Sequence, residues 1–274
     1  MKLSYVKKTL ADVLREHPEY KTILLKFYHG LGDAIDFRAN CLPWLKCNFP
    51  NRRFYFETQL GQEYLFEAVN PCERLYDLSV FISFLCAEWD PGLETKAEKC
   101  ARVELGIEIP PDKEFFYHGI AHKPVFTVDS GLVGVHFVST SNDGLCCPEP
   151  CARLIWEKIE KRGLIPIDTH FRHKGATIDR KVFPWETRNV QDIPATVKKL
   201  FNLLCGVDGF AGVASGNFWA SLCCLDPEKI LFIETEFPVR KLTHIPIKSV
   251  SAKDPDEAVI DAWLDEIMKG RDHV

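Results

Sequence analysis

Residues 21–28 of this 274-residue chain, KTILLKFY, form an apolar run of strand length. A strand with one face in water alternates apolar and polar residues, whereas a parallel strand covered on both faces is apolar along most of its length. Comparable runs recur at 52–58, 78–84, 132–138, 164–168, 209–215 and 229–234. We therefore expect parallel sheets whose strands are buried between helices.

Helix-like stretches separate these runs, and Pro43 interrupts the first of them. Alternating strands and helices are typical of βαβ units, so the predicted fold class is α/β. Proline removes an amide hydrogen, and we expect the helix to break at Pro43. The predicted helical stretches are 33–49, 61–69, 94–106, 148–163, 193–207, 216–225 and 255–270.

Residues 107–131 contain three prolines and little helical periodicity. Such a change in character indicates a domain boundary or an irregular edge. We predict an N-terminal domain at 1–125, a C-terminal domain at 126–253 and a closing helix at 254–274. The simplest architecture is two α/β halves with a cleft between them.

Composition and charge narrow the class of protein. A net charge of −5 gives no basic footprint for nucleic acid, although a local basic patch is compatible with it. The longest apolar run, 78–87, is too short to span a bilayer, and residues 1–20 predict an amphipathic helix rather than a signal peptide. The eleven cysteines lack disulfide-framework and CxxC spacing, so we expect reduced thiols and no metal site. The chain is predicted to be soluble and cytoplasmic.

The first apolar run leads into a glycine turn with Gly30 and Gly32, followed by a helix. The backbone amides of a helix N-terminus suit an anion. A Walker loop is excluded because no Lys-Ser/Thr pair follows. A dinucleotide-binding turn lacks its third glycine, but Glu57 at the end of the second strand keeps this interpretation open as a ribose ligand.

Asp33 follows this turn directly, in the first turn of the expected helix. The helix dipole favours a negative charge at this position. A carboxylate held there can serve as the general base for a hydroxyl group. In the alternative interpretation, Asp33 only stabilises the start of the helix.

Two later strands also end in small polar residues that precede a helix. Hydroxyl groups, amide side chains and backbone amides at such positions can hold a diphosphate, although turn residues of ordinary loops look the same. The candidate residues are Ser139, Thr140, Ser141, Asn142, Ser215, Gly216 and Asn217.

Together these segments resemble the heptosyltransferase-like glycosyltransferases, the ADP-heptose:lipopolysaccharide family. ILLKFYHGLGDAIDF and the following LPWLKCNFPNRRFYF are similar to the family's first strand, glycine–aspartate turn and helix. ETKAEKCARVELGIEIP is similar to the helix that closes the first domain. VGVHFVSTSN and CPEPCARLIWEKIEKRGLIPI resemble the opening of the second domain, and FAGVASGNFWASLCCLDPEKILFIE resembles its Asp-Ser-Gly-x-x-His-x-Ala segment. The resemblance covers most of residues 20–240.

The resemblance implies a GT-B fold, with two Rossmann-like domains facing across a cleft and a nucleotide-sugar held mainly by the second. It implies inverting transfer without a metal or other cofactor. Asp33 matches the family's proposed base, with His29, Gly30 and Gly32 on the acceptor side. On the donor side, Ser139, Thr140 and Ser141 match the loop near the diphosphate, and Ser215 and Gly216 match the Ser-Gly of the third motif. Asn142 and Asn217 follow these two matches directly in the sequence.

The chain also departs from the family pattern. The lysine expected after the hydroxyl-rich loop is absent from Gly144, Leu145 and Cys146. Ala214 stands where the family has aspartate, and Trp219 where it has histidine. These departures leave open a different donor or a loss of activity.

We therefore predict a glycosyltransferase that moves a sugar from a nucleotide-diphosphate donor to an acceptor hydroxyl, with Asp33 as base. The acceptor could be a glycan, a lipid-linked glycan or another hydroxyl compound, and the net acidity weighs against nucleic acid. Two alternatives stay open. One is a non-catalytic nucleotide- or glycan-binding relative, and the other is a nucleotide-dependent oxidoreductase that uses Gly30, Gly32 and Glu57.

Overall fold

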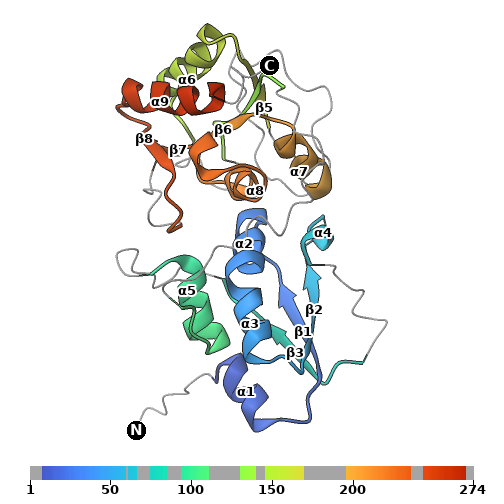
Figure 1. Cartoon of the computed structure of the whole chain (residues 1–274). Helices are drawn as coiled ribbons and strands as arrows, with labels where there is room; N and C mark the ends of the chain where they lie inside the picture. Colours follow the sequence, from blue (N-terminus) through green and yellow to red (C-terminus); the bar gives the residue numbers. More distant parts are fainter. Residues whose placement is uncertain are drawn as a thin grey trace. The chain divides into compact units, whose positions relative to one another are not determined.

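The computed structural model describes residues 8–59, 61–66, 75–84, 94–110, 130–139, 146–169, 196–235 and 243–269. The chain divides into two compact units, Met1–Phe116 and Tyr117–Val274 (Figure 1). Each unit contains a parallel β-sheet with helices, which confirms the predicted α/β class. The predicted boundary between residues 125 and 126 lies outside the described residues and stays a prediction.

The first unit is built on a three-stranded sheet in the order β2-β1-β3, with both pairings parallel. Ile23, Leu25 and Phe27 of the central strand have no exposed surface. Ile23, Leu24 and Leu25 follow one another and are all buried, so both faces of this strand are covered, which explains the apolar character of residues 21–28. The strands are β1 (Thr22–Phe27), β2 (Arg53–Thr58) and β3 (Leu78–Phe81).

One helical path follows β1, through α2 (Leu31–Asp36), a π-helical segment at Phe37–Cys41 and α3 (Leu42–Asn48). The predicted break at Pro43 does not occur. The amide of Leu42 donates to the carbonyl of Phe37, a π-type bond in the turn before proline. This wider turn lets the helix continue past a residue that supplies no amide hydrogen.

The last described helix of the first unit also combines an α-helical and a π-helical segment. It starts as α5 (Lys96–Cys100), continues as a π-helical segment at Ala101–Leu105 and ends at Gly106, whose φ is 67°. A Cβ at Gly106 would lie 2.1 Å from Thr9 Oγ1. Glycine is needed here for the left-handed conformation and for this close approach.

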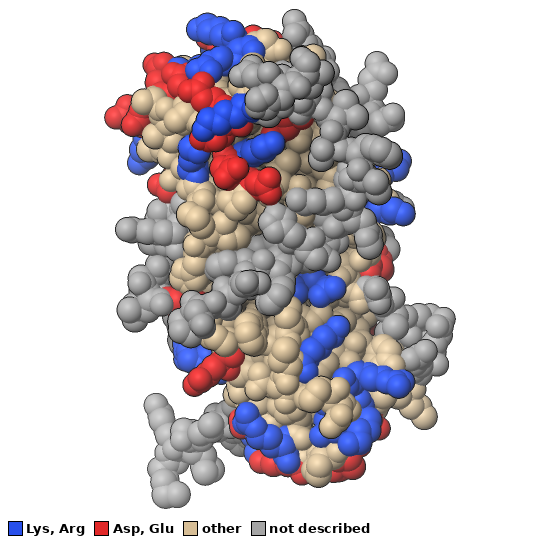
Figure 2. All heavy atoms as spheres, in the orientation of Figure 1, with Lys and Arg blue, Asp and Glu red and all other residues tan. Residues whose placement is uncertain are grey.

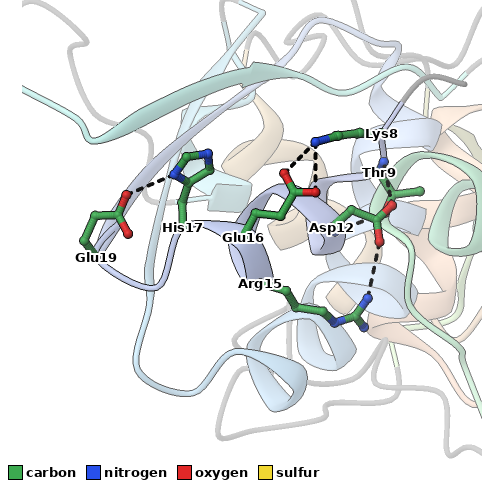
Figure 3. Close-up of polar contacts among 7 residues, drawn as sticks. All are labelled: Lys8, Thr9, Asp12, Arg15, Glu16, His17 and Glu19. Atoms are coloured by element: carbon green, nitrogen blue, oxygen red, sulfur yellow. Dashed lines mark hydrogen bonds and ion pairs between the residues drawn. The ribbon is translucent and has the colours of Figure 1, made fainter. Parts of the chain in front are cut away.

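Short α1 (Leu10–Glu16) is fixed at both ends by local polar contacts (Figure 3). Thr9 and Asp12 form a capping box, in which Thr9 Oγ1 accepts from the Asp12 amide at 3.3 Å. Lys8 Nζ lies 2.6 Å from Glu16 Oε2. The helix stops at His17, because the residue before a proline disfavours the helical conformation. The unit's remaining described helix is α4 (Glu63–Phe66).

The second unit is built on a five-stranded, fully parallel sheet in the order β5-β4-β6-β7-β8. Its central strands are buried along their length, as parallel strands covered on both faces must be. The strands are β4 (Leu132–His136), β5 (Ile165–Asp168), β6 (Gly209–Gly212), β7 (Ile230–Glu234) and β8 (Lys248–Ser251).

Helices cover both faces of this sheet (Figure 1). Trp156 and Trp263, from α6 and α9, share one hydrophobic cluster with Val135. On the other face, Phe218 of α8 packs against Phe232 with ring centroids 4.7 Å apart. The helices are α6 (Glu149–Lys161), α7 (Val197–Cys205), α8 (Gly216–Cys224) and α9 (Glu257–Met268), with a 3₁₀ turn at Pro227–Lys229. Within the described ranges, no helix has the length and apolar character needed to cross a membrane.

Charges of both signs lie together over α6 and α9 in Figure 2. Lys158 Nζ contacts Asp261 at 2.8 Å and Glu257 at 3.0 Å, and these contacts tie the two helices together. The hydrogen bond to Asp261 raises the pKa of Lys158. Partly exposed pairs of this kind contribute little to stability.

A local basic patch does exist in the first unit, as a shallow hollow of about 380 Å³ at the start of β2. The Arg52 guanidinium donates to the carbonyls of Pro18 at 2.8 Å and Leu14 at 3.4 Å, and therefore serves the end of α1. The hollow lies at the amino end of β2. Its lining residues are Lys46, Pro50, Arg52, Arg53, Phe54 and Tyr55.

Candidate functional site

The second unit has a topological switch point between β4 and β6. From β4 the chain crosses to β5 on one side and then returns to β6 on the other side, in the order β5-β4-β6. Open α/β sheets bind their ligands outside the carboxyl ends of the strands at such a point. The two segments predicted to hold the donor follow these two strands.

Strand register brings the starts of these two segments together. His136 of β4 pairs with Gly212 of β6. Ser139 and Ser215 each come three residues later, so both leave the same edge of the sheet at neighbouring strands. Sequence reasoning identified each segment separately, and the sheet order makes them neighbours.

Two hydrogen bonds join the two ends of the segment that follows β4. The amide of Cys147 donates to the carbonyl of Phe137 at 2.8 Å, and the Cys146 thiol donates to the carbonyl of Ser139 at 3.7 Å. Ser139 itself is buried, with 2% exposure. The other predicted residues of this loop, Thr140, Ser141 and Asn142, lie outside the described residues.

The segment after β6 forms the start of α8. Ser215 is the N-cap, and its Oγ accepts from the amide of Phe218 at 3.4 Å. The side-chain amide of buried Asn217 donates to the carbonyl and to the hydroxyl of Thr169, at the end of β5. These two side chains therefore have structural partners within the unit.

The backbone amides at the start of α8 can still bind an anion. Gly216 and Asn217 occupy the first turn of a nine-residue helix. Amides in the first turn of a helix have no carbonyl partner inside the helix, and the dipole adds a partial positive charge. The geometry thus fits the predicted anion-binding role through main-chain groups rather than through the Ser215 and Asn217 side chains.

Two of the positions that depart from the family pattern, Ala214 and Trp219, lie around this turn. Ala214 precedes the N-cap, and Trp219 is buried at 8% exposure, with its ring 5.6 Å from that of Phe218. A tryptophan packed into the α8 face supplies no cation or acid. Within α8, the groups suited to a diphosphate are therefore the first-turn amides.

The first unit has its own switch point between β1 and β3, at the centre of the order β2-β1-β3. Gly30 caps α2, and Asp33 is the third residue of that helix. Lys96, the first residue of α5, donates from Nζ to Asp33 Oδ1 at 2.5 Å. The Asp33 side chain is 30% exposed and that of Lys96 is 23% exposed, so both members of the pair are partly accessible to solvent.

Sequence reasoning missed Lys96, although one signal was present. A lysine at the first position of a helix opposes the helix dipole, which disfavours a cation there. Thr95 and Glu98 mark that start by their capping-box spacing. A cation in an unfavourable helical position calls for a partner, and Asp33 provides it.

His29 ties the end of β1 to the segment after β3. His29 Nε2 lies 3.0 Å from both the Phe84 amide and the Ile82 carbonyl, and it accepts from the amide in one ring tautomer and donates to the carbonyl in the other. The ring is buried at 9% exposure. The contacts of His29 are structural, and its acceptor-side role stays a prediction.

The two glycines of the turn differ in their surroundings. Gly30 has φ −59°, an ordinary value, so its conformation does not require glycine. A Cβ at Gly30 would meet nothing within 4 Å, which leaves room beside the turn. Gly32 lies inside α2, next to Asp33.

Glu57, the residue on which the oxidoreductase alternative depends, lies in β2. Its Oε2 is 3.8 Å from Lys26 Nζ of β1, and the side chain is 25% exposed. Gly32 is a helical residue rather than part of a glycine-rich loop. The arrangement gives the dinucleotide interpretation no further support.

The described cysteines are free thiols, and most are buried. A hydrogen bond with Cys151, together with burial, raises the pKa of the Cys147 thiol. In the described part of the chain, no group of three or more His, Cys, Asp or Glu side chains is arranged to hold a metal ion.

Comparison with known proteins gives no match to a protein-family model and no match to a curated protein. Solved structures do match. The iron-containing dodecameric glycosyltransferase TibC from enterotoxigenic E. coli H10407 is similar over 84% of this chain, with a TM-score of 0.59 and 13% identity. This chain spans 64% of the length of that TibC chain.

Two further glycosyltransferases match along nearly their whole length. E. coli ADP-heptose lipopolysaccharide heptosyltransferase II has a TM-score of 0.61 at 9% identity, covering 92% of this chain and 99% of its own. The family 9 glycosyltransferase from Veillonella parvula DSM 2008 has a TM-score of 0.59 at 12% identity, covering 91% and 98%. The resemblance to heptosyltransferase-like proteins is confirmed in the fold, which is of the GT-B type with two Rossmann-like units.

Proposed function

We propose that the chain is a glycosyltransferase that moves a sugar from a nucleotide-diphosphate-sugar to an acceptor hydroxyl. The observation that carries this proposal is the position of both predicted donor segments at one switch point of the five-stranded sheet. The fold shared with heptosyltransferases supports the same reaction class. A solved structure of E. coli heptosyltransferase WaaC is with ADP-2-deoxy-2-fluoro heptose, which makes ADP-sugars the first donors to test.

The proposed reaction is a single displacement with inversion. The acceptor oxygen bonds to the anomeric carbon while the bond from that carbon to the donor phosphate oxygen breaks. Asp33 takes the proton of the acceptor hydroxyl, as a partly exposed carboxylate can. First-turn amides of α8 offset the charge of the leaving diphosphate, and no metal is assigned to this step. The free thiols support a reducing compartment such as the cytoplasm.

The test of the base is Asp33→Asn, which keeps the shape of the side chain and removes its basicity. Loss of general-base catalysis lowers turnover on the order of 10²- to 10⁴-fold. We expect this fall in kcat, measured by release of nucleoside diphosphate, with unchanged donor affinity. Wild-type turnover in the variant would reject Asp33 as the base.

The donor can be identified by thermal unfolding across a panel of nucleotide-sugars. A ligand that binds the folded state raises the melting temperature in proportion to its saturation. We expect one nucleotide to give the largest shift and to be consumed in the presence of an acceptor. No shift with any member of the panel would contradict a nucleotide-sugar enzyme.

One observation favours a second candidate, a nucleotide-binding protein without transfer activity. Ala214 and Trp219 replace the aspartate and histidine of the family pattern, and the Ser215 and Asn217 side chains already have internal partners. Stabilisation by a nucleotide-sugar with no transfer and no hydrolysis would identify this function.

A further inference from the structure

We infer that Lys96 is a positioning residue for Asp33, and this inference rests on the proposed function of Asp33. Contact between them spans 63 positions of sequence and joins the first turn of α2 to the start of α5. At 2.5 Å between Nζ and Oδ1, it is a charge-assisted hydrogen bond. It fixes one carboxylate oxygen, so that the orientation of the other is set for the acceptor hydroxyl.

Two features hold Lys96 itself in place. The Thr95–Glu98 capping box fixes the backbone where the lysine begins the helix: the Thr95 amide donates to Glu98 Oε2 at 2.7 Å. The lysine Nζ lies 5.0 Å from the centroid of the Phe84 ring, within reach of a cation–π interaction. The ring is buried at 1% exposure and packs 5.7 Å from Phe27.

His29 completes the support. Its Nε2 lies 3.0 Å from the amide nitrogen of Phe84, the residue whose ring lies under the Lys96 ammonium. These contacts link the Asp33 carboxylate, through Lys96, to three segments of the unit: the end of β1, the segment after β3 and the start of α5. A surface ion pair that served solubility alone would need none of these constraints.

Lys96 and Lys99 offer a matched pair of substitutions on the same helix. Lys96→Met removes the ammonium and keeps the length of the side chain, and Lys99→Met makes the same charge change at a partly exposed position of α5. Misplacing a reacting group by about 1 Å can cost on the order of 10²-fold in rate. We expect Lys96→Met to lower kcat about 10- to 100-fold with the donor KM unchanged, Lys96→Arg to restore part of it, and Lys99→Met to behave as wild type.

A double variant separates positioning from general damage to the fold. If Lys96 acts through Asp33, then adding Lys96→Met to Asp33→Asn lowers kcat no further, because residues that act as a unit are not additive. Additive losses, or a wild-type kcat in Lys96→Met, would overturn the inference. If Asp33→Asn keeps wild-type turnover, the proposed base fails; if only Lys96→Met does, the base stands and the positioning role fails.

Discussion

Asp77 is the residue that anchors the amino end of the first sheet. Its Oδ2 accepts from the amides of Lys21 at 2.7 Å and Thr22 at 2.8 Å, and from the Thr22 hydroxyl at 3.0 Å. The Thr22 amide bond first, and then that from Lys21, lower the pKa of this carboxyl from 3.8. One carboxylate thus joins the residue before β3 to the start of β1.

This arrangement predicts a pH-dependent contribution to stability. Because the folded pKa lies below the unfolded one, the stabilisation is present above about pH 3.8 and is lost as the pH falls through the folded pKa. Asp77→Asn should lower the free energy of unfolding near pH 7, and the deficit should shrink on acidification below about pH 4. Urea unfolding at several pH values measures this difference in the free energy of unfolding, and Asp254→Asn, at an exposed position, is the control. A deficit that is independent of pH would contradict this assignment.

The residue scale also shows where prediction from sequence ends. Asp33 was identifiable because the features that point to it are contiguous in the sequence: a strand, a glycine turn and the first turn of a helix. Lys96 was not, because its partner is distant in sequence and the contact exists only after β1 and α5 have packed in the same unit. For the same reason, the side-chain bonds of Asn217 to Thr169 had no signal in the sequence.

At the scale of elements, continuous apolar runs predicted every described strand but β8. Lys248–Ser251 is short and polar and pairs with β7, at the end of the strand order, so it needs no long apolar run. The path through Pro43 was also unpredictable, because residue periodicity does not distinguish a broken helix from one that continues through a π turn.

At the start of α8, the capping role of Ser215 can be distinguished experimentally from the proposed binding of an anion. Asp and Asn cap helices about as well as Ser, whereas Ala costs about 1 kcal/mol. Ser215→Asp should therefore keep the free energy of unfolding but place a negative charge where the diphosphate is proposed to bind. We expect at least a tenfold loss of donor affinity by calorimetry, about 1.4 kcal/mol.

Ser215→Asn is the matched control for this experiment, since it caps the helix without the charge. It should keep both stability and affinity near the wild-type values. Equal donor binding by the Asp and Asn variants would mean that the diphosphate does not approach α8. Ser215→Ala, in turn, should lose stability without a selective loss of affinity.

At the scale of the whole molecule, α/β class and parallel strands could be predicted because each depends on patterns within a few tens of residues. The order of strands could not, since neighbours in a parallel sheet are far apart in the chain: β4 pairs with both β5 and β6. That order turns two unremarkable polar segments into one candidate site. The residue pattern identified both segments and the family resemblance joined them, and the sheet supplies the physical reason for grouping them.

The two units should respond differently to ligands. If the donor binds at the switch point of the second unit, nucleotide-sugar should slow amide hydrogen exchange after β4 and in the first turn of α8. Exchange in α2 and at the start of α5 should change little with the donor alone, because Asp33 and Lys96 are assigned to the acceptor.

Hydrogen exchange with mass detection measures both regions of the intact chain in one experiment. Saturating donor is compared with the free protein, and the buried strands β1 and β7 serve as internal references. Binding suppresses local opening only where contacts are gained, so protection should map to residues 137–139, 146–147 and 215–218. Protection centred on Gly30–Asp33 would instead place the nucleotide in the first unit, and the assignment of donor and acceptor sides would have to be exchanged.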